Sequence, residues 1–555
     1  MSLTPRPADA LGYANPMLDA DWPDPDVTRV DERYVLVASS FNRSPGLPVL
    51  VSDDLVHWSI ASHALDRIHP VEHFELPRHG QGVWAPSIRF HDGLLRIYYP
   101  DPDRGIFVVT APGPEGPWSE PVAVLEGLGL IDPCPLFDGE HVYLVHGWAA
   151  SRSGRSNELT VVELDASGTR PIGIPRTVID GDEVPGCTTL EGPKFYRRGE
   201  HYYVFAPAGG VATGWQMAFR STSPWGPYES RIVLEQGETA VNGPHQGGWV
   251  TANDGSDWFV HFQDTGAFGR VVHLQPMTWH DDWPVMGEPR EGLPGQPVTG
   301  MRWSSGRATA ESASRDHHRF APPAAGVPAR SDDFAGTSLS PQWHWQANPR
   351  PGQVTLRGDR TLVLPLRSND SGNIRTLPQV LSQQLPQSPT TVTTSLHLDS
   401  GAEGARAGLT VLGTEYAWIG LTVSGGRVHV TGGVGPGHRG DRAFVEMAPV
   451  ASDLPVELRL RSSSDARVDF AWRQGDGEWT EAIMPFRARQ GTWIGAEIGL
   501  FSAAPYGAVD TGEAVFGPVE VAPAATQEEP HRRGREAAAS SKLPEVEQPH
   551  ERNLA

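Results

Sequence analysis

The chain has 555 residues, with 45 basic and 67 acidic side chains and a formal net charge of −22. A charge this negative argues against nucleic acid and anionic membrane surfaces as partners, because both are bound through clustered basic residues. The two cysteines, Cys134 and Cys187, allow at most one disulfide and cannot form a cysteine-rich zinc site.

The first 17 residues lack the basic region and apolar stretch of a classical secretion signal. No run in the chain approaches the ~18 apolar residues that a membrane-spanning helix needs. We therefore expect a cytoplasmic protein without a membrane partner.

Five segments in the first 303 residues repeat one layout: a Pro or Gly anchor, a short strand, a polar turn and a second strand rich in aromatic and β-branched residues. The second strand starts about nine residues after the anchor, and successive anchors lie 61, 47, 60 and 55 residues apart. The anchors are Pro25, Pro86, Pro133, Pro193 and Gly248. Further strands follow several hairpins, as in LPVLVSDDLVHW and WQMAFRSTSPWGPY. Four strands per unit, repeated five times, predict a five-bladed β-propeller over residues 1–303, rather than a sandwich with unrelated hairpins.

The rest of the chain divides by composition. Residues 304–328 are rich in Ala, Ser and Pro, lack strand periodicity and are expected to form a linker. Residues 329–523 alternate apolar and polar positions, as in TTVTTSLHL, which predicts a β-sandwich and makes the whole protein all-β. Residues 524–555 are charged and nearly free of large apolar side chains, so we expect a disordered tail.

Three acidic side chains lie at equivalent places in different blades of the predicted propeller. Asp24, Asp132 and Glu191 stand just ahead of their anchors, where the innermost strands begin and converge at one mouth of the channel. Trp84 with Ala85, and His245 with Gln246, occupy the corresponding places in the other two blades. Each acid alone could simply cap a local turn, but a core does not normally hold three carboxylates, because burying unpaired charge is costly. The pattern predicts a polar funnel at this mouth.

Several motifs resemble glycoside hydrolase family 43. They include NPMLDADWPDPDV, VWAPSI, GLIDPCPLF, EGPKFY and GPHQGGWV, and the similar region covers residues 12–300. The segment SDDFAGTSLSPQWHWQANP resembles the opening of the concanavalin-like C-terminal domain of β-xylosidases in that family. The resemblance implies an exo-acting, inverting glycosidase of β-xylosidase or α-L-arabinofuranosidase type, which releases a terminal pentose from plant cell-wall oligosaccharides such as arabinoxylan.

The resemblance also implies roles for the three acids. Asp24, in the PDP motif, matches the general base that activates water, and Glu191, in EGP, matches the general acid. Asp132, in IDP, matches a third acid that orients Glu191 and raises its pKa by like-charge repulsion. A glutamate near its ordinary pKa would be deprotonated at pH 7 and could not donate a proton.

Five further residues are implied to bind substrate. Phe41 and Trp84 would form apolar walls for a sugar, Arg270 would bond its hydroxyls near the base, and Trp493 would reach across from the sandwich to close the funnel. His245 matches a histidine near a calcium in relatives. The resemblance therefore implies that a calcium ion could bind near His245. Calcium prefers oxygen ligands, so one histidine cannot define that site, and we expect no required cofactor and no assigned metal ligands.

Two alternatives remain open at this point: a retaining fructan hydrolase of similar architecture, and a carbohydrate-binding propeller without catalysis. The first is disfavoured because the triplets here are PDP, IDP and EGP, and the second because all three acids are present. The sequence leaves open the choice between xylose and arabinose, and it leaves open the oligomeric state, a homo-oligomer included.

Overall fold

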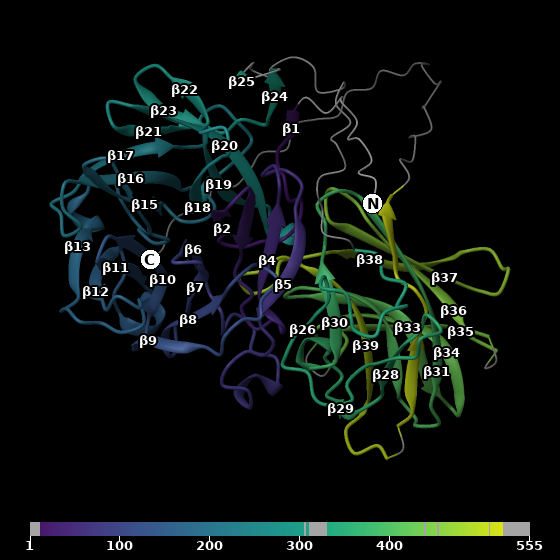
Figure 1. Ribbon diagram of the computed structural model, residues 1–555. Coiled ribbons are helices and arrows are strands. Elements are labelled where there is room, and N and C mark those ends of the chain that lie inside the picture. The colour runs from purple at the N-terminus through teal and green to yellow at the C-terminus, as the bar shows by residue number, and fades with distance from the viewer. Residues whose placement is uncertain are drawn as a thin grey trace, which may run out of the picture.

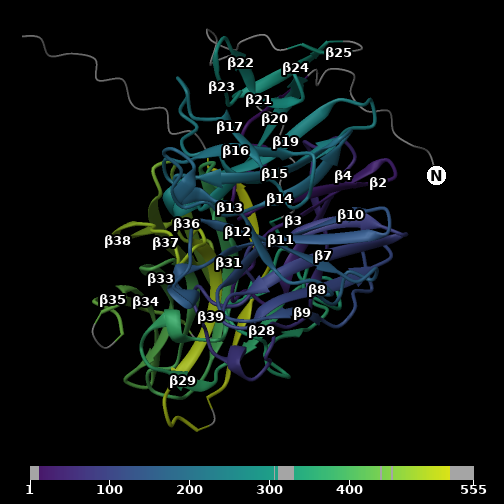
Figure 2. The same cartoon turned by 90° about the vertical axis from the view of Figure 1, so that its left-hand side faces the viewer.

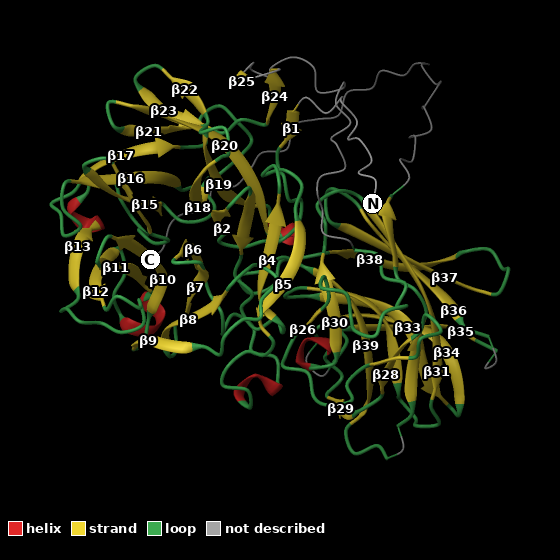
Figure 3. Ribbon diagram, viewed as in Figure 1, coloured by secondary structure: helices red, strands yellow, loops and turns green. Residues whose placement is uncertain are grey.

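The computed structural model describes residues 12–304, 307–309, 330–437, 440–451, 454–509 and 511–524. The described part is all-β (Figure 3), with one short α-helix, α1 (Ala150–Ser153), and four 3-10 turns at His73–Glu75, Gly181–Glu183, Gly266–Phe268 and Ile374–Thr376. None of the described helices is both long and apolar enough to cross a membrane. Two β domains lie side by side in Figure 1, the first in purple to teal and the second in green to yellow.

The first domain contains five blades, each made of four consecutive antiparallel strands. The first three blades are β2–β5 (Asp26–Val30, Arg33–Val37, Gly46–Ser52, Ser59–Leu65), β6–β9 (Ser87–His91, Leu94–Asp101, Gly105–Ala111, Val122–Glu126) and β10–β13 (Leu130–Asp138, His141–Trp148, Glu158–Leu164, Arg176–Asp180). The last two blades are β14–β17 (Lys194–Arg198, His201–Ala208, Trp215–Ser221, Glu229–Leu234) and β18–β21 (His245–Thr251, Asp257–Asp264, Arg270–His280, Trp283–Met286). The five-bladed propeller is confirmed.

The repeat found in the sequence corresponds to the first two strands of each blade. In every blade the second strand starts eight or nine residues after the anchor. The first strands β2, β6, β10, β14 and β18 are innermost, and β2 also contacts β18, which closes the ring between the first and last blades. Figure 2 shows the blades fanned out in front of the second domain.

Five short strands, in two groups, extend the propeller. β22 (Glu288–Arg290) and β23 (Leu293–Gln296) join the fourth blade, and β1 (Gly12–Ala14) pairs with β24 (Gly300–Ser304). β24 also pairs with β25 (Arg307–Thr309), a short strand within the predicted linker 304–328. A three-residue strand is too short to produce a sequence periodicity, which is why it escaped notice. The remaining linker residues, 310–328, and the predicted tail beyond Ala524 lie outside the described residues.

The second domain is a sandwich of two eight-stranded sheets. The first contains β26 (His344–Trp345), β30 (Val380–Gln384), β39 (Glu497–Pro505), β32 (Arg406–Leu412), β33 (Tyr416–Ser424), β34 (Arg427–Gly435) and β35 (Ala443–Pro449), with β29 (Ser368–Asp370) beside β39. The second contains β27 (Thr355–Leu356), β28 (Leu362–Pro365), β40 (Glu513–Phe516), β31 (Thr390–Asp399), β36 (Val456–Ser462), β37 (Arg467–Gln474) and β38 (Thr480–Arg487), with β41 (Glu520–Pro523) beside β31. Strict alternation along β31 buries Val392, Leu396 and Leu398 in the core between the sheets.

The two domains share a hydrogen-bonded interface. Ser44 of the propeller and Trp345 of the sandwich exchange two backbone hydrogen bonds, at 3.0 and 2.7 Å. The amide N–H of Ala496 donates to the carbonyl of Ala267 at 2.7 Å, just before β39 begins. Phe268 packs into the hydrophobic core of the sandwich. The start of β39 is therefore held against the propeller.

Candidate active site

The predicted funnel acids lie where the innermost strands begin. Asp24 comes two residues before β2, Glu191 three residues before β14, and Asp132 at an irregularity near the start of β10. Asp24 and Asp132 share a left-handed backbone, with φ of 54° and 55°. Non-glycine residues adopt this conformation at a cost on the order of 1 kcal/mol, and such strain concentrates at functional sites.

Asp24 is held from two directions. The Ser39 hydroxyl donates to one carboxylate oxygen at 2.5 Å, and Arg270 Nη1 donates to the other at 2.6 Å. The Asp24 side chain is only 6% exposed and that of Arg270 9%. Arg270 is 246 positions away in the chain, so Asp24 does not merely cap a local turn. A carboxylate fixed between a hydroxyl and a guanidinium is oriented to accept a proton from water.

Asp132 and Glu191 are joined through one peptide unit. The backbone N–H of Gly192 donates to Asp132 Oδ2 at 2.8 Å. Gly192 has φ of +59°, and a Cβ at this position would come within 2.8 Å of the Gln246 side chain, so only glycine fits here. Asp132 is therefore kept close to the Glu191 backbone.

The environment separates the pKa values of these two acids. Burial, with a further contribution from the charge of Asp24, raises the pKa of Asp132 to about 6, although the Gly192 N–H opposes the shift. Burial and then the negative charge of Asp132 raise the pKa of Glu191 to about 8, against the opposing charge of Arg270. Near pH 7, Asp132 is thus largely ionised while Glu191 keeps its proton. A protonated glutamic acid opposite a carboxylate is the pair that general acid–base catalysis requires.

His245 lies beside the acid. Its Nε2 is 3.5 Å from Glu191 Oε1. Complete burial, together with Arg270 and His261, lowers the pKa of His245 to about 3, so its ring is neutral. Neither ring nitrogen has a hydrogen-bond partner in the described structure.

The described residues around His245 do not form a cluster of metal ligands. Calcium takes six to eight oxygen ligands. Among the described residues, no group of three or more His, Cys, Asp or Glu side chains could hold a metal ion. A calcium ion near His245 is therefore not supported.

Three aromatic side chains form a continuous wall. The rings of Phe41 and Trp84 lie 6.0 Å apart between centroids, and those of Trp84 and Trp493 lie 6.1 Å apart. Trp84 Nε1 donates to the carbonyl of Gly80 at 3.0 Å, which fixes the indole. Trp493 comes from the sandwich, yet it is 51% exposed and so is not part of the sandwich core. Aromatic faces of this kind stack on the C–H groups of sugars.

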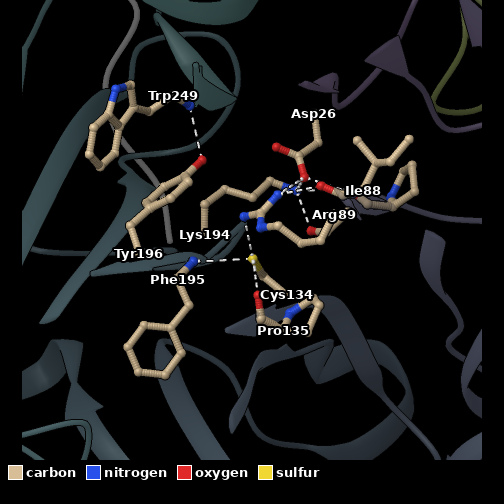
Figure 4. A network of polar contacts seen from close by, with 11 residues as sticks. Asp26, Ile88, Arg89, Cys134, Pro135, Lys194, Phe195, Tyr196 and Trp249 are labelled. Carbon is tan, nitrogen blue, oxygen red and sulfur yellow. Dashed lines mark hydrogen bonds and ion pairs between the residues drawn. The ribbon is translucent and has the colours of Figure 1, made fainter. Parts of the chain in front are cut away.

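Gln246, expected beside His245 at the mouth, hydrogen-bonds to Asp132. Sequence reasoning missed one site residue and one buried support. Ser39 contacts Asp24, and only its nearness to Phe41 in the chain could have suggested this. Lys194, one of the two lysines, is fully buried beneath the acids, where Nζ donates to the Pro86 carbonyl and to the Ser87 hydroxyl at 2.8 and 2.7 Å. It also lies 3.8 Å from Asp26 (Figure 4).

The cysteines take no evident part in chemistry. Arg89 and the Phe195 N–H donate to Cys134 Sγ at 2.8 and 3.1 Å, within the buried network of Figure 4. Burial raises the pKa of Cys187 to about 11, which leaves its thiol protonated at neutral pH. Both thiols are free and buried.

Comparison with protein families agrees with both domains. The family described as glycosyl hydrolases family 43 matches residues 13–284. The β-xylosidase C-terminal concanavalin A-like domain matches residues 331–522.

Curated relatives carry glycosidase names. A putative β-xylosidase of Xylanibacter ruminicola is 36% identical over 502 residues, which is 88% of this chain and 86% of that protein. A non-reducing end α-L-arabinofuranosidase of Bacteroides ovatus, BoGH43B, is 35% identical over 297 residues, 50% of this chain and 54% of that protein.

Solved structures share the fold. A xylan β-1,4-xylosidase of Bacillus halodurans superposes with a TM-score of 0.75 over 92% of this chain and 99% of that one, at 22% identity. A bifunctional family 43 protein of Bacteroides eggerthii gives 0.77 over 93% of this chain and 64% of that one, at 23% identity. Assignment to this glycosidase family excludes both earlier alternatives, the retaining fructan hydrolase and the carbohydrate-binding propeller without catalysis. The chain belongs to glycosyl hydrolases family 43 and is a glycosidase with a β-xylosidase-type C-terminal domain.

Proposed function

We propose that this glycosidase is exo-acting and inverting, and that it releases terminal β-D-xylopyranose or α-L-arabinofuranose from arabinoxylan-type oligosaccharides. The observation that carries the proposal is the different environment of the two acids Glu191 and Asp24. Glu191, with its pKa raised to about 8, keeps a proton at neutral pH, while Asp24 is bound to Arg270.

The proposed reaction has one displacement. Asp24 accepts a proton from a water molecule as the water oxygen attacks the anomeric carbon. The bond from that carbon to the leaving oxygen breaks, and Glu191 donates its proton to this oxygen. Because water attacks from the face opposite the leaving group, the configuration inverts, as in glycosidases whose two carboxyls leave room for water.

Asp132 has a positioning role in this scheme. Its charge keeps the pKa of Glu191 high, and its contact with Gly192 fixes the backbone next to the acid. Arg270 balances the charge of Asp24 and would also bond sugar hydroxyls. His245, neutral and buried, fills the space behind Glu191 without adding a charge.

The aromatic wall supports a small terminal sugar as substrate. Phe41 and Trp84 would stack against an uncharged pentose, and Trp493 would close the funnel so that chains enter by their ends. The name of the Xylanibacter relative supports xylose and that of the Bacteroides relative supports arabinofuranose.

Parallel assays test the proposal. The p-nitrophenyl glycosides of β-D-xylopyranose and α-L-arabinofuranose, followed by xylo- and arabino-oligosaccharides, identify the sugar and the exo pattern. Release of single pentoses from chain ends, lost in Asp24→Ala, is expected. Internal cleavage as the main reaction, or full activity in Asp24→Ala, would refute the assignment.

A further inference from the structure

A buried ion network crosses the domain interface close to the candidate active site. Glu497, at the start of β39 in the sandwich, accepts from Arg43 Nε at 2.5 Å, from His344 Nε2 at 2.8 Å and from the Ser382 hydroxyl at 3.0 Å. Burial opposes the charge on Glu497, but Arg43 and His344 outweigh it and hold the pKa of Glu497 below its usual value. Arg43 belongs to the propeller, and its side chain and that of Glu497 are 5% and 4% exposed.

A second nitrogen of the Arg43 guanidinium contacts a propeller residue. Arg43 Nη2 donates to Asp21 Oδ2 at 2.9 Å, and the Asp21 side chain is completely buried. One guanidinium therefore bridges a carboxylate from each domain. Arginine can do this because its donors lie in a fixed planar fork.

Asp21 in turn holds the backbone from which Arg270 projects. Asp21 Oδ1 accepts the backbone N–H of Arg270 at 2.9 Å, and Asp21 also accepts the N–H of Gly495 from the sandwich. A Cβ at Gly269 would come within 2.1 Å of the same Asp21 oxygen, so the carboxylate fits tightly against this turn. Arg270 opens β20, and its guanidinium donates to Asp24.

We infer that Glu497 and Arg43 are positioning residues for the reaction: through Asp21, they fix the placement of Arg270 and hence the orientation of Asp24. The inference rests on the proposed role of Asp24 as the base. It gives the sandwich a part in orienting the base, in addition to carrying Trp493. The contacts form an unbroken series from β39 to the carboxylate of Asp24.

Little room for water exists around this network. The two cavities beside Arg43 have volumes of about 20 and 10 Å³, which is room for about one water molecule each at most. If one partner loses its charge, the remaining buried charges are satisfied by such a water or by movement of the protein groups that contact them. The turn at Gly269 and Arg270 is one of these groups, because Asp21 accepts the N–H of Arg270.

The test compares Glu497→Gln with a matched control. Glu497→Gln keeps the shape of the side chain but removes its charge, and we expect kcat to fall about tenfold with KM changed less than twofold. The loss should be equal on natural oligosaccharides and on aryl glycosides, because activation of water is needed with every leaving group. Arg330→Gln removes another ion pair between the domains, Arg330 with Asp19 at 2.7 Å, and should leave kcat unchanged.

A double-mutant cycle shows whether the effect runs through Arg270. If it does, Glu497→Gln should cost much less in an Arg270→Lys background than in the wild type, whereas Arg330→Gln should be additive with Arg270→Lys. Arg43→Lys provides a second route, because lysine keeps the charge but cannot bridge both carboxylates in the same way, and it should show the same kinetic pattern. Thermal melting confirms that each variant is folded.

Two results would overturn the inference. One is a folded Glu497→Gln or Arg43→Lys variant with wild-type kcat, and the other is full additivity between Glu497→Gln and Arg270→Lys. Failure of the proposed function gives a different outcome, since Asp24→Ala would then retain activity. A dead Asp24→Ala beside a fully active Glu497→Gln rejects the positioning role alone.

Discussion

Replacement of Asp132 by Asn should move the alkaline limb of the pH–rate profile to lower pH. The limb reports loss of the proton from Glu191, whose pKa is raised to about 8 by burial first and by Asp132 second. Because the pKa of Asp132 is only about 6, this residue carries its full charge where the limb falls. Asparagine keeps the shape and removes the charge, so one of the two main causes of the raised pKa disappears.

The size of the shift follows from Coulomb's law. Asp132 accepts the N–H of the peptide unit that joins Glu191 to Gly192, and we take a separation of roughly 7 Å between the two carboxyls as the working value. At an effective dielectric constant of about 20, this separation gives an interaction on the order of 2 kcal/mol. Since one pH unit corresponds to about 1.4 kcal/mol, the limb should move down by between about one and two units. Burial remains in the variant, so the limb should stay above the ordinary glutamate value.

The assay is kcat/KM from pH 4 to 10 on a natural oligosaccharide, whose leaving group requires the acid. Asp138→Asn is a matched control, because Asp138 ends the same strand, β10, and pairs with Arg197 away from the funnel. The control should keep the wild-type limb. An unmoved limb in Asp132→Asn, in a folded protein, would show that Asp132 orients groups without tuning the proton of Glu191.

Three further predictions follow from the same contacts. Glu191→Ala should lower kcat/KM by several orders of magnitude on oligosaccharides but far less on aryl glycosides, whose phenolate leaves unaided. Asp24→Ala should lower kcat/KM strongly on both substrates. If Glu191→Ala loses as much as Asp24→Ala on both substrates, the acid is misassigned. Trp493→Ala should raise KM for oligosaccharides about tenfold, because an aromatic face is lost. The control Tyr506→Ala replaces a sandwich aromatic that is 89% exposed and should leave KM unchanged. Equal KM values in both variants would show that Trp493 does not contact substrate. Glu191→Gln should raise the melting temperature more at pH 8.5 than at pH 4.5. A buried acid whose pKa is about 8 in the folded protein and 4.5 in the unfolded chain lowers the stability of the fold as pH rises between these two values, and glutamine does not titrate. An equal gain at both pH values would contradict the raised pKa.

The propeller and the convergence of the three acids could be predicted because both depend on a layout that repeats along the chain. The anchors mark the start of each innermost strand, and in a closed ring these starts must meet at one mouth. Since Asp24, Asp132 and Glu191 stand at equivalent places in their blades, their convergence follows from the repeat alone.

The supporting contacts could not be predicted, because they join positions far apart in the chain. Arg43 and Glu497 are 454 positions apart, and nothing in either local sequence indicates the partner. The contact of Trp493 with Trp84 was expected only through the family resemblance. The backbone strain at Asp24 and the unpartnered ring of His245 depend on three-dimensional packing and have no signal in composition or spacing.

The stereochemistry of the released sugar tests the central assignment most directly. Proton NMR during the first turnovers, before mutarotation, identifies the anomer that is formed. If Asp24 is a base that activates water, β-D-xylosides should yield α-D-xylopyranose and α-L-arabinofuranosides should yield β-L-arabinofuranose. Release of the sugar with its configuration retained would make Asp24 a nucleophile and would contradict the account.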